Sequence, residues 1–104
     1  MASRKRRVVW ALGAQDALTE ALEFIGADSP DGARRVLGAA LESAASLESL
    51  SKRGRTVPEC NDPSIREIFV YSYRMMYRVE PDTVTIIAFL HGARDFERWA
   101  REQP

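Results

Sequence analysis

Residues 65–90 read IREIFVYSYRMMYRVEPDTVTIIAFL, and this stretch decides the fold. It is rich in β-branched and aromatic residues, which favour strands. Two short segments, Tyr71-Ser72 and Glu80-Pro81-Asp82-Thr83, interrupt it with turn-forming residues, and this spacing is typical of an antiparallel meander. The sequence therefore predicts three consecutive strands, at Ile65–Tyr71, Tyr73–Val79 and Val84–Leu90.

The middle strand has two different faces, because successive side chains on a strand point to opposite sides. We expect one face to pack against helices, namely the face of Tyr73, Met75, Tyr77 and Val79. The opposite face is expected to carry Arg74, Met76 and Arg78. The sheet is thus predicted to have one covered face and one arginine-bearing face.

Working outward towards the N-terminus, the hydrophobic period changes to that of a helix. A helix is predicted from about Ala14 to near Gly26, because its apolar residues recur at i, i+3, i+4 and i+7. A new helix is expected after Asp28, where Ser29 is a good N-cap and Pro30 suits the first helical position. That helix runs for about four turns and is predicted to stop where Gly54 follows Lys52-Arg53.

Arg6–Trp10 completes the order as a short first strand, and the polar segment 91–99 is either a short helical turn or a frayed end. The order β-αα-βββ predicts one α+β domain over residues 1–104, with a helical hairpin packed on one face of a small antiparallel sheet. The predicted core comprises Leu18, Leu22, Ile25, Val36, Leu37, Leu41, Ile68, Tyr77, Val84 and Ile86.

Composition narrows the functional classes. Hydrophobic residues make up 45% and charged residues 29% of the chain, which is ordinary for a globular protein. A single cysteine, Cys60, excludes an internal disulfide, and the absence of paired His/Cys spacing argues against a zinc site. We expect no metal and no cofactor. The apolar run after Arg4-Lys5-Arg6-Arg7 is too short for a signal peptide or a membrane span, so a cytoplasmic protein is predicted.

The net charge of zero conceals local segregation. Residues 1–10 carry four basic and no acidic side chains, whereas residues 11–50 carry seven acidic and two basic ones. Residues 51–78 are again basic. Such basic ribbons are suited to a polyanion or an acidic partner peptide.

Several motifs carry a resemblance to a known family. The chain resembles the RelE/ParE superfamily of type II toxins in its order of elements and in four segments, which are Gly54-Arg55-Thr56-Val57-Pro58-Glu59, Arg66-Glu67-Ile68, residues 73–79 and His91-Gly92-Ala93-Arg94-Asp95. The first and last of these look closest to the ParE or plasmid-stabilisation branch. The resemblance implies a toxin that inhibits DNA gyrase, a cognate ParD-like antitoxin and no sequence-specific DNA binding by this chain.

Two alternatives stay open. A RelE-like ribosome-dependent mRNA endonuclease would need a general acid and base beside its cations, and His91 is the only candidate that titrates near neutrality. Nucleases of that branch typically have a tyrosine or histidine near the C-terminus. This chain lacks the late tyrosine and has Trp99 in that region. The third reading is a non-toxic module that only binds an antitoxin.

The candidate target- or partner-binding residues are Arg55, Arg66, Arg74, Arg78, His91, Arg94 and Asp95. Purely structural roles are also open for several of these residues. Arg66 is equally well read as a loop anchor, His91 as a strand-end cap, and Arg94 and Asp95 as partners of each other or of the loop at Arg55. The sequence therefore leaves the catalytic residues undetermined.

Overall fold

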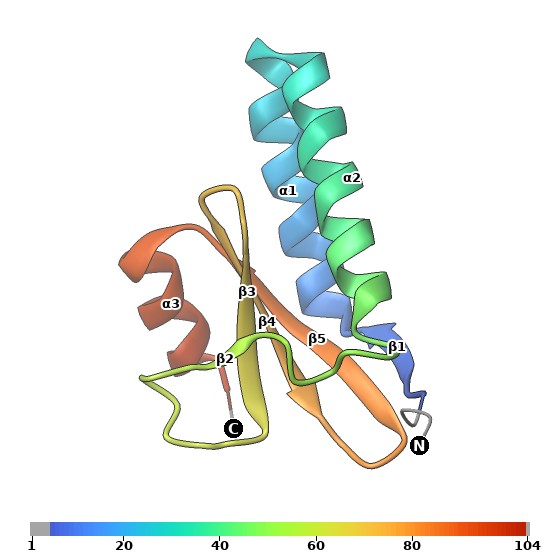
Figure 1. The fold of residues 1–104 in the computed structure, drawn as a ribbon. Coiled ribbons are helices and arrows are strands. Elements are labelled where there is room, and N and C mark those ends of the chain that lie inside the picture. Colours follow the sequence, from blue (N-terminus) through green and yellow to red (C-terminus); the bar gives the residue numbers. More distant parts are fainter. Residues whose placement is uncertain (1–4, 104) are drawn as a thin grey trace.

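The computed structural model describes residues 5–103 as a helical hairpin, a five-stranded sheet and a C-terminal helix (Figure 1). The elements, in chain order, are β1 (Arg7–Trp10), α1 (Leu12–Asp28), α2 (Pro30–Ser46), β2 (Arg55–Thr56), β3 (Ile65–Val70), β4 (Tyr73–Val79), β5 (Thr83–Leu90) and α3 (Gly92–Arg101). The predicted α+β class and β-αα-βββ order are confirmed. Within residues 5–103, no helix has the length and apolar character needed to cross a membrane.

The strands lie in the order β1-β5-β4-β3-β2. The predicted meander of β3, β4 and β5 is antiparallel throughout. β1 pairs in parallel with β5, with Val8 opposite Val84 and Trp10 opposite Ile86. The sheet, predicted to be antiparallel, is therefore mixed at one edge; the hairpin of α1 and α2 supplies the long connection that a parallel pair needs.

The helix-start signal at residues 28–31 acts as expected. The Ser29 hydroxyl accepts a hydrogen bond of 2.9 Å from the Gly32 backbone N–H, and Pro30 is the first residue of α2. α1 continues two residues beyond the predicted end at Gly26. α2 ends at Ser46, so the predicted stop at Gly54 is wrong: residues 47–53 form turns instead.

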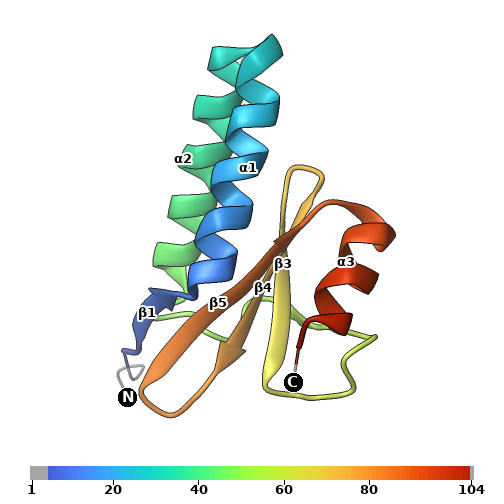
Figure 2. The same cartoon turned by 180° about the vertical axis from the view of Figure 1, so that it is seen from behind.

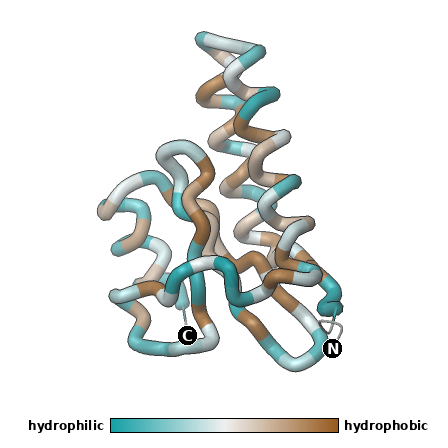
Figure 3. Tube along the Cα trace, in the orientation of Figure 1, coloured by the Kyte–Doolittle hydropathy of each residue, from teal (hydrophilic) through white to brown (hydrophobic). Residues whose placement is uncertain are grey.

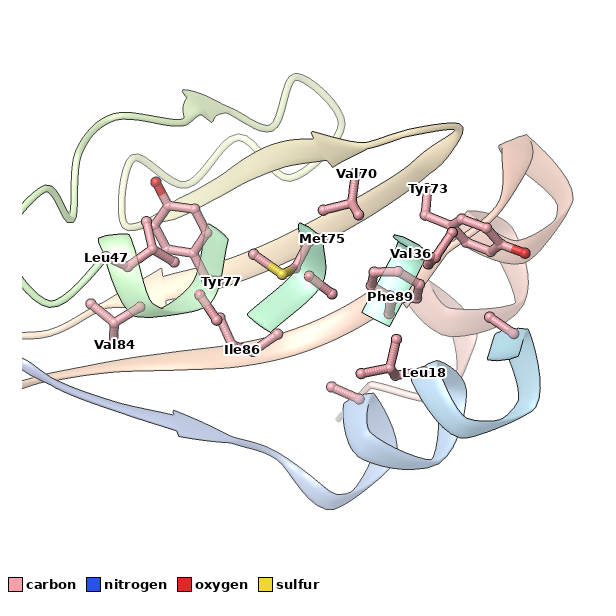
Figure 4. Packing of buried hydrophobic residues seen from close by; sticks show 14 residues of the cluster. Leu18, Val36, Leu47, Val70, Tyr73, Met75, Tyr77, Val84, Ile86 and Phe89 are labelled. Atoms are coloured by element: carbon pink, nitrogen blue, oxygen red, sulfur yellow. The ribbon is translucent and has the colours of Figure 1, made fainter. Parts of the chain in front are cut away.

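The main core lies between the hairpin and the sheet. Side chains from both helices meet those of β4 and β5: Leu18 and Val36 lie around Phe89, and Leu47, just after α2, lies by Tyr77 (Figure 4). The hydropathy of the trace follows this layering, because hydrophobic segments run along the strands and recur along both helices (Figure 3). Of the predicted core, Leu18, Val36, Tyr77, Val84 and Ile86 are buried, and Leu22, Ile25 and Ile68 pack against that core partly buried.

Two predicted core residues are wrong. Leu37 is 37% exposed and Leu41 is 51% exposed. The apolar positions of α2 span more than one face, and the face that meets the sheet is that of Val36, Ala40 and Ala44. Truncating Leu37 therefore removes less buried surface than a core position would lose.

A β-bulge changes which side chains of β5 face the hairpin. Met76 is opposite Ala88 and Tyr77 is opposite Ile86, so Ile87 is an extra residue on β5. Ile86 belongs to the hairpin-side core, and after the bulge Phe89 does too. Ala88 and Leu90 consequently point to the opposite face of the sheet.

That opposite face is partly covered by α3 (Figure 2). Phe96 and Trp99 of α3 pack on a second cluster formed by Val57, Ile65, Met76, Ala88 and Leu90. The C-terminal segment is thus helical, as in the first of the two readings that the sequence left open, but it forms a helix of ten residues and not a short turn. Met76 lies on the face that was predicted to carry arginines. The centre of that face is apolar, because Met76 belongs to the second cluster.

Candidate functional site

Two of the predicted arginines meet on the α3 side of the sheet, around a buried glutamate. Arg55 of β2 donates from Nε to Glu67 Oε2 over 2.6 Å. Arg74 of β4 donates from Nε to the other oxygen, Oε1, also over 2.6 Å. The Glu67 side chain has no exposed surface, whereas Arg74 keeps 12% and Arg55 59% of theirs. The carboxylate is therefore a buried anion held between two cations.

Arg74 is bound a second time by the loop before β3. Its two terminal nitrogens donate to Glu59 over 3.0 and 2.9 Å, which is the bidentate geometry that planar guanidinium groups favour. These bonds hold the pKa of Glu59 below its usual value of 4.5. The carboxylates of Glu59 and Glu67 in turn raise the pKa of Arg74, so this guanidinium is charged and bound on both sides.

Aromatic rings flank the same cluster. The guanidinium of Arg55 lies 5.4 Å from the ring centre of Phe69, and that of Arg74 lies 5.0 Å from the ring centre of Phe96 in α3. Such cation–π contacts add to the ion pairs. Arg74 therefore ties β4 to β3, to the loop at Glu59 and to α3.

Arg66 lies on the other face of β3. Its NH1 donates to the carbonyl oxygens of Gly54 over 2.7 Å and of Lys52 over 3.3 Å. The sequence left Arg66 open as a binding residue or as a loop anchor. Its hydrogen bonds are those of a loop anchor. Gly54 is held there from a second side, because its N–H donates to the hydroxyl of Tyr77 over 2.9 Å.

Arg78 stands apart from the other cations. Its guanidinium is 3.7 Å from the Asp62 carboxylate, and both side chains are about two-fifths exposed. Pairs of this kind at a surface contribute little to stability.

His91, Arg94 and Asp95 lie at the junction between β5 and α3. Asp95 accepts from the His91 backbone N–H over 3.0 Å and lies 3.4 Å from Arg98. The His91 ring packs 4.8 Å from the ring centre of Tyr73, and makes no capping hydrogen bond. Within residues 5–103, the Arg94 side chain has no hydrogen bond or ion pair, so the expected pairing with Asp95 or with the loop at Arg55 is not made.

A groove of about 920 Å³ opens beside this junction, between α1 and α3 across the end of β5. A hollow of about 360 Å³ adjoins it at the hairpin tip, and the two share Phe24, Tyr73 and His91. The apolar lining of the larger groove includes Ala17, Ala21, Phe24, Phe89 and Trp99. Phe24 is 79% exposed, so its ring is available at the rim.

The charge of the larger groove is mainly acidic. Its charged lining residues are Asp16, Glu20, Asp95, Glu102 and Arg98, and His91 also lines it. α1 contributes no basic residue at all. The basic stretches of the sequence suggested an acidic partner peptide, but this groove favours a segment of the opposite charge.

Sequence reasoning missed Glu59, Glu67 and Gly54 as parts of the arginine network. The one available signal was strand alternation, which places Glu67 between Ile65 and Phe69 on a single face. A carboxylate in the middle of such a face requires a cation. The positions of Arg55 and Arg74 opposite it depend on strand pairing that spacing alone does not give.

A helical hairpin packs against one side of a mixed sheet, and an open groove lies beside it, so the molecule is a small α+β protein. The fold is that of one chain in the solved structure "Chromosomal ParDE TA system from P. aeruginosa", with a TM-score of 0.71, 16% sequence identity, and coverage of 88% of this chain and 100% of that chain. No curated protein matches the sequence.

Residues 8–96 match the model of the family described as ParE toxin of type II toxin-antitoxin system, parDE. The chain therefore belongs to the ParE toxin family, and is the toxin component of a type II toxin-antitoxin system with an antitoxin as its partner. The resemblance to the RelE/ParE superfamily is confirmed.

Proposed function

We propose that this toxin acts in the cytoplasm by binding and inhibiting DNA gyrase, without catalysing a reaction itself, and that a ParD-like antitoxin neutralises it. The observation that carries the proposal is that three of the candidate arginines are bound to partners within the fold. Arg55 and Arg74 are bound to carboxylates, and Arg66 is bound to backbone carbonyls. Such groups serve the fold, whereas a nuclease needs cations that are free to meet a developing phosphorane charge.

The position of His91 also favours a binding mechanism over the RelE-like one. Its ring packs on Tyr73, which stacks on Phe89 within the hairpin-side core. Arg74 is the next residue along β4 and therefore points to the opposite face. The one histidine and the central guanidinium are thus divided by the sheet, which is unfavourable for joint acid-base and electrostatic catalysis.

Two assays distinguish the proposed target from the alternative. The purified toxin should inhibit supercoiling of relaxed plasmid by gyrase, and should leave a translation reaction with purified ribosomes unaffected. The antitoxin added first should abolish the effect. Cleaved mRNA in the translation reaction, with supercoiling intact, would replace the gyrase proposal with the nuclease one. A chain that has no effect in either assay and causes no growth arrest would be the non-toxic binding module.

The His91→Gln variant is expected to keep nearly full toxicity, because glutamine retains a neutral hydrogen-bonding group and loses only the proton shuttle. Growth arrest after induction is the measurement. Loss of a general acid or base would instead lower the rate by about 10² to 10⁴, so an inactive variant that still folds and binds antitoxin would contradict a binding mechanism.

Arg94→Ala is the informative counterpart to that variant. Because the Arg94 guanidinium has no bond to another residue in the 5–103 range, its removal breaks no internal ion pair. We propose Arg94 as a contact to the target, with Arg78, whose side chain is 43% exposed and only loosely paired with Asp62, as a further exposed cation. The variant should therefore melt like the wild type and inhibit gyrase less.

The groove between α1 and α3 is the proposed seat of an antitoxin segment. Its apolar floor and acidic walls fit an amphipathic segment that places apolar side chains against Phe24 and Trp99 and basic ones against Asp16 and Glu20. Recognition by charge would also steer the antitoxin to this side of the toxin.

Phe24→Ala tests this assignment. The ring is 79% exposed, so the variant should unfold at the wild-type temperature, and it should bind the antitoxin about 30-fold more weakly, as expected for an aromatic hot spot. Titration calorimetry with the purified antitoxin gives the affinity. Leu12→Ala is the matched control, because Leu12 is 72% exposed on the same helix and does not line either hollow. Equal affinities of the two variants would contradict the assignment of the groove.

A further inference from the structure

The solvent side of α2 carries an apolar stripe that nothing in residues 5–103 covers. Its members recur every three or four residues and are all exposed, whereas Val36, Ala40 and Ala44 on the other side of the helix are buried. The stripe consists of Leu37, Gly38, Leu41 and Ala45, with Arg34 at one end and, in the turn that follows α2, Glu48 at the other. None of these residues lines either of the two hollows described above.

Gly38 at the centre of this stripe has no packing explanation among residues 5–103. A glycine in the middle of a helix weakens that helix relative to alanine. A Cβ at Gly38 would meet no atom of the described part of the chain within 4 Å, so packing there does not require a glycine. Close approach of a second helix over this surface accounts for a glycine here.

The charges of the stripe are self-complementary. Arg34 stands seven residues before Leu41 and Glu48 seven residues after it, about two helical turns in each direction. If two copies of α2 cross antiparallel with Leu41 on the two-fold axis, Arg34 of each copy faces Glu48 of the other. Leu37 then faces Ala45 of the partner copy, so a large apolar side chain meets a small one.

The present partners of these two charges do not prevent the exchange. Arg34 pairs with Asp31 one turn away, and Glu48 pairs with Lys5 over 3.5 Å. All four side chains are at least half exposed. Ion pairs at such a surface are weak and exchange readily.

We propose that α2 forms a two-fold symmetric, antiparallel contact between two copies of this toxin, centred on Leu41. A single helix pair buries less than the roughly 1,200 Å² of a standard stable interface. The dimer is therefore weak and concentration-dependent. Because the groove between α1 and α3 lies elsewhere on the surface, a dimer of this kind leaves the proposed antitoxin site open in both copies.

Disulfide trapping tests the symmetry axis directly, since only a residue near a two-fold axis meets its own copy. The full chain, freed from its antitoxin by unfolding and refolded, is used in a Cys60→Ala background. Leu41→Cys should form a covalent dimer under mild oxidation. The matched control is Glu42→Cys, which is also exposed but lies about 100° around the helix, and it should remain monomeric.

Charge reversal tests the register. Arg34→Glu and Glu48→Arg should each weaken dimerisation about tenfold in sedimentation velocity, because each places like charges together twice. The double variant should restore the wild-type association. The proposal is overturned if the wild type stays monomeric at every concentration, if Glu42→Cys crosslinks as well as Leu41→Cys, or if the double variant fails to recover. Loss of antitoxin binding in these variants without any dimer would assign the stripe to the antitoxin instead.

Discussion

Replacing Glu67 with alanine is expected to lower the free energy of unfolding by about 3 to 5 kcal/mol, the usual result of removing one partner from a buried ion pair. The Glu67 side chain has no exposed surface and accepts from both Arg55 and Arg74. Its loss leaves the nearly buried Arg74 with only the outer carboxylate of Glu59. Urea denaturation followed by circular dichroism gives the measurement.

Arg78→Ala is the control for this experiment. It also removes one charge of an ion pair on the same sheet, but this pair is wide and about two-fifths exposed. Its effect should stay within about 0.5 kcal/mol of zero. A Glu67→Ala variant that is no less stable than Arg78→Ala would show that the network does not hold the sheet together.

Gly54→Ala is expected to cost about 2 to 5 kcal/mol, because the added methyl group overpacks the site and displaces a buried hydrogen bond. A Cβ at this position would lie 2.5 Å from the Glu67 carbonyl oxygen and 2.6 Å from the Tyr77 hydroxyl. Both neighbours are held in place, the first by its strand and the second by burial. Thermal and urea unfolding of the purified variant measure the loss.

Gly38→Ala provides the matched comparison, with the same substitution in open space. Since nothing lies within 4 Å of the new Cβ, alanine should stabilise the monomer by up to about 1 kcal/mol through its helix propensity. If the two glycine variants had equal stability, the close approach at Gly54 would not be a structural constraint.

The contacts made by residues 54–59 explain why the segment Gly54–Glu59 is a recognisable motif. Gly54 permits the close approach to β3, and Arg55 binds Glu67. Val57 is 2% exposed in the second core cluster, and Glu59 binds Arg74. The motif is therefore a fold-stabilising device that fastens the loop before β3 to the sheet. Its presence in the sequence identifies the family more directly than it identifies the surface that meets the target.

Local patterns in the sequence determined the elements of this protein. Alternation in residues 65–90 predicted the three-stranded meander, and Ser29 and Pro30 marked the start of α2, because these signals depend on contacts between residues close in the chain. The motifs were sufficient to identify the family. They were not sufficient to assign the site, because a motif names residue types and not their partners.

Only the tertiary structure decided how the elements meet. The parallel pairing of β1 with β5, the bulge at Ile87 and the exposure of Leu37 depend on register and on the placement of the hairpin over the sheet. The roles of Arg55, Arg66 and Arg74 depend on the same geometry, since their partners lie 7 to 15 residues away in sequence. Side-chain periodicity specifies which face of an element is apolar, but the partner across that face is chosen by packing of the whole chain.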